Sequence, residues 1–174
     1  YCVPMTFKPW GLGWASRRLR RIPGSKDLFT AAAWVVVCVL EPFAARPEVH
    51  LGALLTASIW TFTLVFNRSI AFDIKDLQGD SIVGKETIPI VLGKQATKLM
   101  LLGFVLFQAS ILIWAASSGL VSNLGYWLLG SVAFECLYLG LYHRRIITRG
   151  ILFELVVDAS LIVPAVITLL WEAF

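Results

Sequence analysis

The chain has 174 residues, of which 58% are hydrophobic and 15% charged, and its formal net charge at pH 7 is +4. Its mean hydropathy of +0.78 is too high for an ordinary soluble domain and predicts an all-α, polytopic bundle of transmembrane helices. The basic excess needs no nucleic acid to explain it, because Lys and Arg gather in loops where they can meet the anionic headgroups of a lipid bilayer. We therefore expect the bilayer, and no nucleic acid, as a partner.

Five apolar segments are candidates for membrane-spanning helices, which need about 20 residues each. In chain order they cover residues 28–45, 50–72, 99–118, 120–142 and 151–174. The first is short because Glu41 and Pro42 close its apolar stretch. None shows the polar face of period 3.6 that a soluble bundle would require. We therefore interpret residues 1–174 as a single membrane domain.

The loops between these segments predict the orientation in the membrane. Lys and Arg residues are concentrated in residues 1–27, in residues 73–98 and around residues 144–149, whereas the intervening turns carry almost none. Short cytoplasmic loops are enriched in basic residues. The pattern predicts a basic cytoplasmic segment at 1–27, an aspartate-rich cytoplasmic loop at 73–98, and a multi-pass protein of the cell inner membrane whose C-terminus lies outside.

Three carboxylates follow the second apolar segment, at Asp73, Asp76 and Asp80. If the preceding helix continues, the spacings of three and four residues place them on one helix face. Like charges in such a cluster raise one another's pKa unless a cation lies among them. Carboxylate oxygens suit Mg²⁺, which takes one or two protein carboxylates together with water and substrate phosphate. The face therefore predicts a Mg²⁺ site that binds a diphosphate.

The residues around these aspartates form a longer motif. Residues 73–93 read D-I-K-D-L-Q-G-D-S-I-V-G-K-E-T-I-P-I-V-L-G. This segment resembles the second aspartate-rich motif of the UbiA-type intramembrane prenyltransferases, D-x-x-D-x-x-G-D-x-x-x-G-x-x-T-x-P-x-x-x-G. The resemblance implies an all-helical fold with nine transmembrane helices, of which this chain would supply helices five to nine as the C-terminal portion of a longer prenyltransferase.

The resemblance also implies a function and a set of site residues. The reaction would be Mg²⁺-dependent transfer of a polyprenyl group from its diphosphate to an aromatic or other lipophilic acceptor, as in quinone biosynthesis. Asp76 and Asp80 match the catalytic aspartates of the motif, and with Asp73 they would be the metal ligands. Lys85 matches a flanking position where it would reach the diphosphate, unless it is only a topological lysine. Tyr1 resembles the tyrosine of the family's Y-x-x-x-K element.

Several polar residues inside the apolar segments allow two interpretations. Asn67 and Arg68 precede the aspartate face by one to two helical turns. In one interpretation both contact the diphosphate. In the other, Asn67 bonds a neighbouring helix and Arg68 extends to the lipid headgroups. Asp158 and Glu135 lie within apolar segments, where a carboxylate is costly and must face protein or a polar cavity. For both acids we favour a structural role, which for Asp158 would be a pairing with the basic loops.

Three other functions remain as alternatives. The first motif of the family, N-D-x-x-D-x-x-x-D, does not occur in these residues, so the chain would be a catalytically silent fragment that needs its N-terminal half. A cation-coupled membrane transport protein would also use intramembrane carboxylates. A CDP-alcohol phosphotransferase would use carboxylates and Mg²⁺, but its D-G-x-x-A-R element is absent.

Overall fold

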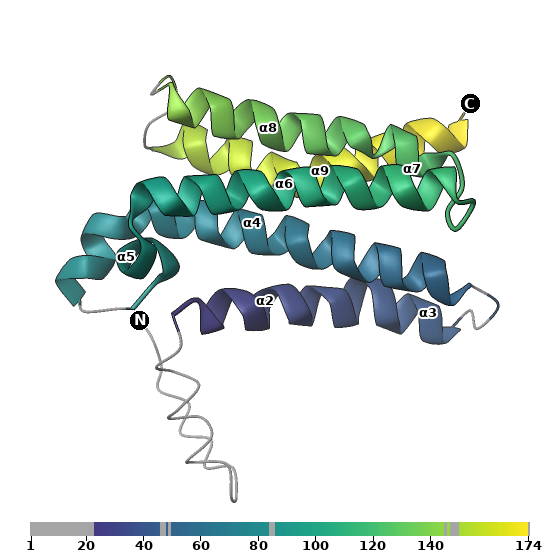
Figure 1. Ribbon diagram of the computed structural model, residues 1–174, viewed down its shortest axis with the longest axis horizontal. Helices are drawn as coiled ribbons and strands as arrows, with labels where there is room; N and C mark the ends of the chain where they lie inside the picture. The colour runs from purple at the N-terminus through teal and green to yellow at the C-terminus, as the bar shows by residue number, and fades with distance from the viewer. Residues whose placement is uncertain are drawn as a thin grey trace, which may run out of the picture.

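The computed structural model describes residues 23–45, 48, 50–83, 86–144, 146 and 150–173, and within these ranges every regular element is helical. The predicted all-α class is therefore confirmed. Figure 1 shows the long helices running side by side as a bundle, with the turns gathered at its two ends.

The first long helix is built from three pieces that follow without a break. They are α2 (Ser25–Val35), a π-helical turn (Val36–Leu40) and α3 (Glu41–Ala45). Pro42 explains the wide turn: a proline has no N–H and its ring collides with the carbonyl four residues earlier, here that of Cys38, and a π-turn relieves that collision. The helix thus continues through Pro42, and the whole run Ser25–Ala45 is long and apolar enough to span a membrane.

The second long helix, α4, covers Leu51–Val83 and extends well beyond the predicted end at residue 72. Its 33 residues give a length of about 50 Å at 1.5 Å per residue. Nothing between Asp73 and Val83 interrupts the helical hydrogen bonds, since this stretch contains no proline and only Gly79 as a weak helix former. The segment predicted as a loop at 73–98 is therefore mainly helical in its described part.

The remainder of that segment and the last three long helices follow in order. A short helix, α5 (Ile88–Leu92), ends at Gly93, whose φ of 81° is a backbone conformation that glycine adopts without strain. Then come α6 (Lys94–Ser117), α7 (Leu124–Trp127), α8 (Leu129–His143) and α9 (Ile151–Ala173). The end of α4, the start of α6 and the end of α8 meet at the same end of the bundle (Figure 1).

Four helices of the described chain are long and apolar enough to cross a membrane, at Ser25–Ala45, Lys94–Ser117, Leu124–His143 and Ile151–Ala173. The prediction named five spans, and the difference is α4. Its threonines together with Asn67 and Arg68 lower its hydropathy, and such a helix is suited to the protein interior rather than to lipid.

Packing places α4 in that interior position. It contacts α2 on one side and α6 and α9 on the other, so that in Figure 1 it separates α2 from the layer of α6, α8 and α9. Its residues Val65 and Ile70 are almost fully buried and belong to the main apolar core, together with Leu101 of α6 and Val157 of α9.

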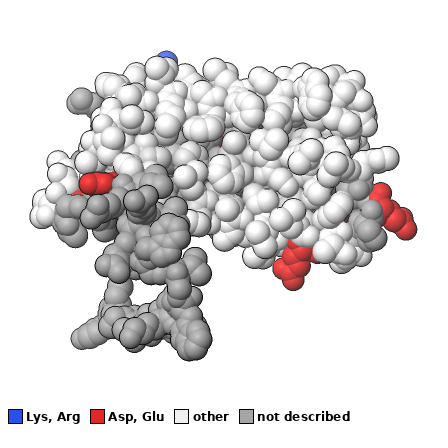
Figure 2. All heavy atoms as spheres, turned by 60° about the horizontal axis from the view of Figure 1, so that its bottom comes forward, with Lys and Arg blue, Asp and Glu red and all other residues white. Residues whose placement is uncertain are grey.

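The outer surfaces of the bundle are apolar. In Figure 2 the middle of the visible face carries no charged side chain among the described residues, and acidic residues lie toward its ends. Large side chains such as Phe29, Trp34, Leu106 and Leu169 are exposed, which in water would be unfavourable but in a bilayer faces hydrocarbon. The fold is that of a multi-pass membrane protein with α4 at its centre.

Candidate functional site

The predicted aspartate face is carried by the last three turns of α4, so the helix does continue through all three residues. Their surroundings differ. Asp73 is 3% exposed and Asp80 is 8% exposed, whereas the Asp76 side chain is 56% exposed and lies 3.5 Å from Lys75 Nζ. In the part of the chain that the structure describes, no group of three or more His, Cys, Asp or Glu side chains converges as a complete metal site. A metal held here would therefore rest on one or two of these aspartates.

Asp73 lies at the junction of α4 with the start of α2. Lys26 Nζ donates to Asp73 Oδ1 at 3.2 Å, and the same ammonium lies 3.9 Å from Asp27 Oδ1. The hydroxyl of Ser69 donates to Asp27 Oδ1. The second oxygens of both carboxylates, Asp27 Oδ2 and Asp73 Oδ2, are buried and have no hydrogen-bond partner among the described residues. Two buried carboxylates thus share the ammonium of Lys26, and each keeps one oxygen without a hydrogen-bond partner among the described residues.

This arrangement is electrostatically short of positive charge. Asp73 lies one residue beyond the predicted span. The pKa of its carboxyl is raised to about 6, because burial and the neighbouring Asp27 carboxylate raise it by more than the Lys26 ammonium lowers it. Burial without full compensation disfavours the charged form. A divalent cation at the unpartnered oxygens would supply that missing charge, and carboxylate oxygens are the ligands that Mg²⁺ takes. The donor set at Asp73 therefore fits Mg²⁺.

Asn67 lies one and a half turns earlier on α4 and is fully buried. Its side-chain nitrogen donates to Glu135 Oε2 of α8 at 3.1 Å. The Gln108 amide of α6, with its nitrogen toward the carboxylate, donates to Glu135 Oε1 at 3.0 Å. The contact is the one expected of the structural alternatives for Asn67 and Glu135, and diphosphate binding by Asn67 stays a prediction.

Arg68 points to a different helix. Its Nε donates to Asp158 Oδ1 of α9 at 3.0 Å, and its guanidinium carbon lies 5.0 Å from the centroid of the Phe72 ring. About two turns later on α4, Lys75 donates to Glu154 of α9. Asp158 is therefore ion-paired, as the structural interpretation requires, but its partner is a helix residue rather than a basic loop. These contacts join α4 to α9 at the point along α4 where the aspartate face begins.

Two predicted site residues, Lys85 and Tyr1, lie outside the described residues, as do the basic residues between positions 8 and 21. Thr87, which matches the threonine of the motif, is buried, and its hydroxyl has no partner among the described residues.

Sequence reasoning missed Asp27 and treated Lys26 only as a topological charge. One signal was present in the sequence, because the two are consecutive charged residues at the start of an apolar segment. The structure then buries Asp27, which is only 1% exposed. Their proximity to Asp73, which is 47 positions from Lys26, depends on how α2 packs on α4, and no local pattern contains that information.

Comparison with known proteins gives a consistent result. The model of the UbiA prenyltransferase family matches residues 10–150. A curated relative, somaliensene A/B synthase of Streptomyces somaliensis, is 35% identical over 103 residues, which are 59% of this chain and 31% of the relative. The chain thus matches about a third of the length of that relative. No solved structure matches.

Proposed function

Because the chain belongs to the UbiA prenyltransferase family, we propose that it takes part in transferring a polyprenyl group from a prenyl diphosphate to a lipophilic acceptor, commonly an aromatic ring, within the membrane. The observation that carries this proposal is the buried Asp73 carboxylate with one unpartnered oxygen, on the helix face that also carries Asp76 and Asp80. Membership of this family does not favour the transport alternative.

In the proposed site, Mg²⁺ would be held by one or two carboxylates of the aspartate face, drawn from Asp73, Asp76 and Asp80, with water and substrate oxygens completing its coordination. When bound, the metal neutralises the negative charge that develops on the departing diphosphate. Asp76 is exposed near the end of α4, where a diphosphate can reach it, whereas Asp73 and Asp80 are buried. Because the matched region is only about a third of the relative's length, the proposed activity is that of the full-length protein and not of this chain alone.

The residues around the aspartates have distinct tasks. Lys26 binds Oδ1 of Asp73 by its 3.2 Å contact. Oδ2 of Asp73 remains without a hydrogen-bond partner among the described residues. Arg68 and Lys75 hold α4 against α9, which fixes the position of the aspartate face relative to α9. Lys85 is proposed to contact diphosphate oxygens as a point charge. Apolar walls exclude water, which would otherwise quench an allylic cation.

The setting follows from the same reasoning. The aspartate end of the bundle is proposed to face the cytoplasm, in the inner membrane, because the loops at that end carry most of the basic residues. The prenyl tail gains little free energy on leaving lipid for an apolar groove, since both surroundings are hydrocarbon. Recognition must therefore depend chiefly on the diphosphate, its metal and the acceptor pocket.

The test uses the native full-length protein in membranes, with radiolabelled geranylgeranyl diphosphate and a panel of aromatic acceptors. Asp76→Ala and Asp80→Ala are expected to abolish Mg²⁺-dependent transfer while the protein still inserts. The matched control is Glu172→Ala, an exposed acidic residue at the other end of the bundle, which should retain activity. Near-normal turnover by both aspartate variants would contradict the metal assignment.

A second arm of the same experiment omits the acceptor. The relative is named as a synthase, so release of diphosphate with formation of a new hydrocarbon product in this arm would assign a synthase reaction instead of transfer to an acceptor. Product formation only when an acceptor is present would support the transferase proposal.

A further inference from the structure

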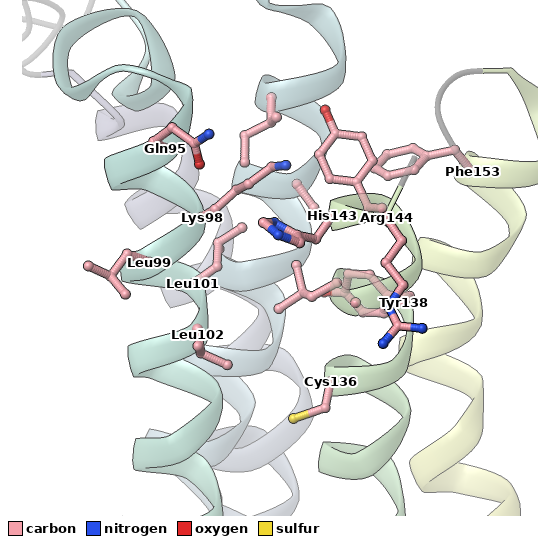
Figure 3. Close-up of a pocket in the computed structure, with 15 residues that line it drawn as sticks. Gln95, Lys98, Leu99, Leu101, Leu102, Cys136, Tyr138, His143, Arg144 and Phe153 are labelled. Atoms are coloured by element: carbon pink, nitrogen blue, oxygen red, sulfur yellow. The ribbon is translucent and has the colours of Figure 1, made fainter. Parts of the chain in front are cut away.

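A cavity lies between α6 and α8, apart from the aspartate face. Its volume is about 410 Å³, and Ala71 and Ile74 of α4 and Phe153 of α9 also line it. This volume is in the usual range of small-ligand sites. In the close-up of Figure 3 the labelled lining residues lie toward the end of the bundle where α6 begins and α8 ends.

The lining changes from polar to apolar along the helices. Near the end where α6 begins and α8 ends, the lining residues are Gln95 and Lys98 of α6 and His143 and Arg144 of α8. Figure 3 shows Lys98 and His143 extending into the space between the two helices, and the Arg144 side chain running along α8 toward Tyr138. Further along the helices the described lining is apolar apart from a thiol and a tyrosine ring, and it consists of Leu99, Leu101, Leu102, Cys136, Tyr138 and Leu139.

The charge at this end of the cavity has one sign. Among the described residues that line the cavity, Lys98, Arg144 and His143 are basic and none is acidic. A further basic residue, Lys94, is held nearby, because its Nζ lies 5.2 Å from the centroid of the Tyr142 ring while that of Lys98 lies 4.7 Å from the same ring. The ring attracts both ammonium groups through its negative face and so keeps two like charges close together, where an anion is favoured.

We propose that this cavity binds an anionic phospholipid of the bilayer, with the phosphate at Lys98, Arg144 and His143 and one acyl chain along the leucine-lined part. Basic pockets between transmembrane helices at a membrane interface bind such headgroups by electrostatic attraction. The basic end of the cavity is level with the turns of the bundle, which is the depth of lipid phosphates, and the apolar part runs toward the bilayer interior. The proposal does not depend on the prenyl-transfer reaction.

Glycine positions on the two helices provide a test that does not alter charge. Gly140 lines the cavity, and a Cβ atom added there meets nothing within 4 Å. Leucine at this position would project into open space and occupy the place of the acyl chain. Gly103 of α6 is equally open but does not line the cavity, so Gly103→Leu is a matched control for the added bulk.

The experiment is native mass spectrometry of the full chain in mild detergent, with equal amounts of dioleoyl phosphatidylglycerol and dioleoyl phosphatidylcholine. The wild type should retain one phosphatidylglycerol in preference to phosphatidylcholine. The double variant Lys98→Gln with Arg144→Gln should weaken that binding by roughly 25-fold, since each basic residue near an anionic lipid contributes about a fivefold factor. Gly140→Leu should abolish it, and Gly103→Leu and Lys75→Gln should not.

Three outcomes would overturn the proposal. One is equal retention of the two lipids by the wild type. The second is phosphatidylglycerol binding that persists in both the charge variant and Gly140→Leu. The third comes from a parallel arm with geranylgeranyl diphosphate: if that compound binds with the same dependence on Lys98, Arg144 and Gly140 while phosphatidylglycerol does not, the cavity belongs to the prenyl substrate and not to a lipid.

Discussion

Glu135 and Asp73 are both buried carboxylates inside this bundle, at 0% and 3% exposure, yet their surroundings are opposite in kind. Both oxygens of Glu135 accept hydrogen bonds from neutral amides, those of Asn67 and Gln108. Asp73 shares one ammonium with a second carboxylate and keeps one oxygen without a partner.

The difference separates a structural acid from a candidate ligand. Burying a polar group costs free energy unless its hydrogen bonds are made, so a carboxylate with both oxygens satisfied needs nothing more, and one left incomplete is suited to a further cation. Glu135 therefore joins α4, α6 and α8, whereas Asp73 is open to a ligand. The following predictions test this division.

The largest expected effect is on activity. Asp73→Ala in the full-length protein should lower Mg²⁺-dependent prenyl transfer by a factor on the order of 100 or more, because it removes a group that stabilises transition-state charge. Glu135→Gln, which keeps the size of the side chain and one of its two acceptor oxygens, should retain activity within about threefold. The measurement is initial rate at saturating Mg²⁺. Equal losses in the two variants would remove the distinction between the two acids.

The second effect is on stability, for which we expect Glu135 to matter more than Asp73. Glu135→Leu leaves the amides of Asn67 and Gln108 buried without their acceptor, which we expect to cost roughly 2–4 kcal/mol of unfolding free energy. The measurement is the thermal unfolding midpoint in detergent, with Glu135→Gln as the matched control. An unfolding midpoint in Glu135→Leu equal to that of the wild type would show that the buried amide contacts contribute nothing to stability.

The third prediction concerns pH in the absence of metal. The pKa of Asp73 in the folded protein is about 6, above its usual 3.8, so the folded state binds more protons than the unfolded state between these values. Stability must then fall as pH rises from about 4 to 6 and stay lower at pH 7. Thermal unfolding with EDTA should show this decline, and Asp73→Asn should remove the part due to this carboxyl. Added Mg²⁺ should restore stability at pH 7.

A pH profile that is the same in the wild type and in Asp73→Asn would contradict the assignment of the raised pKa to this group. Recovery by Mg²⁺ in Asp73→Asn equal to that in the wild type would place the cation elsewhere.

The smallest effect is expected at Arg68 and Asp158, whose side chains are 27% and 48% exposed. A double-mutant cycle with Arg68→Met and Asp158→Asn should give a coupling free energy below about 1 kcal/mol, since partly exposed ion pairs contribute little. A coupling as large as the loss in Glu135→Leu would show that this pair, rather than the buried amide cluster, dominates the attachment of α4.

Much of this molecule was predictable from sequence because the signals are local. Apolar runs predicted the long helices, since a lipid environment demands about 20 such residues in sequence, and only α4 differed among the spans, owing to its polar residues. The motif around Asp76 and Asp80 indicated the family that comparison then confirmed. The π-turn before Pro42 and the helical extension of α4 to Val83 were missed, because helix ends and irregular turns depend on packing around them.

The sequence by itself determined that the chain is a helical membrane protein with an acidic helix end, because composition and spacing are properties of neighbouring residues. Only the tertiary structure decided which carboxylates have both oxygens hydrogen-bonded and which keep one oxygen without a partner. The partners of Asp73 lie more than 45 positions away at Lys26 and Asp27, and those of Glu135 lie on two other helices. Such pairings follow from the rotation and depth at which helices pack against one another, and these are set by the whole buried surface rather than by any segment of it.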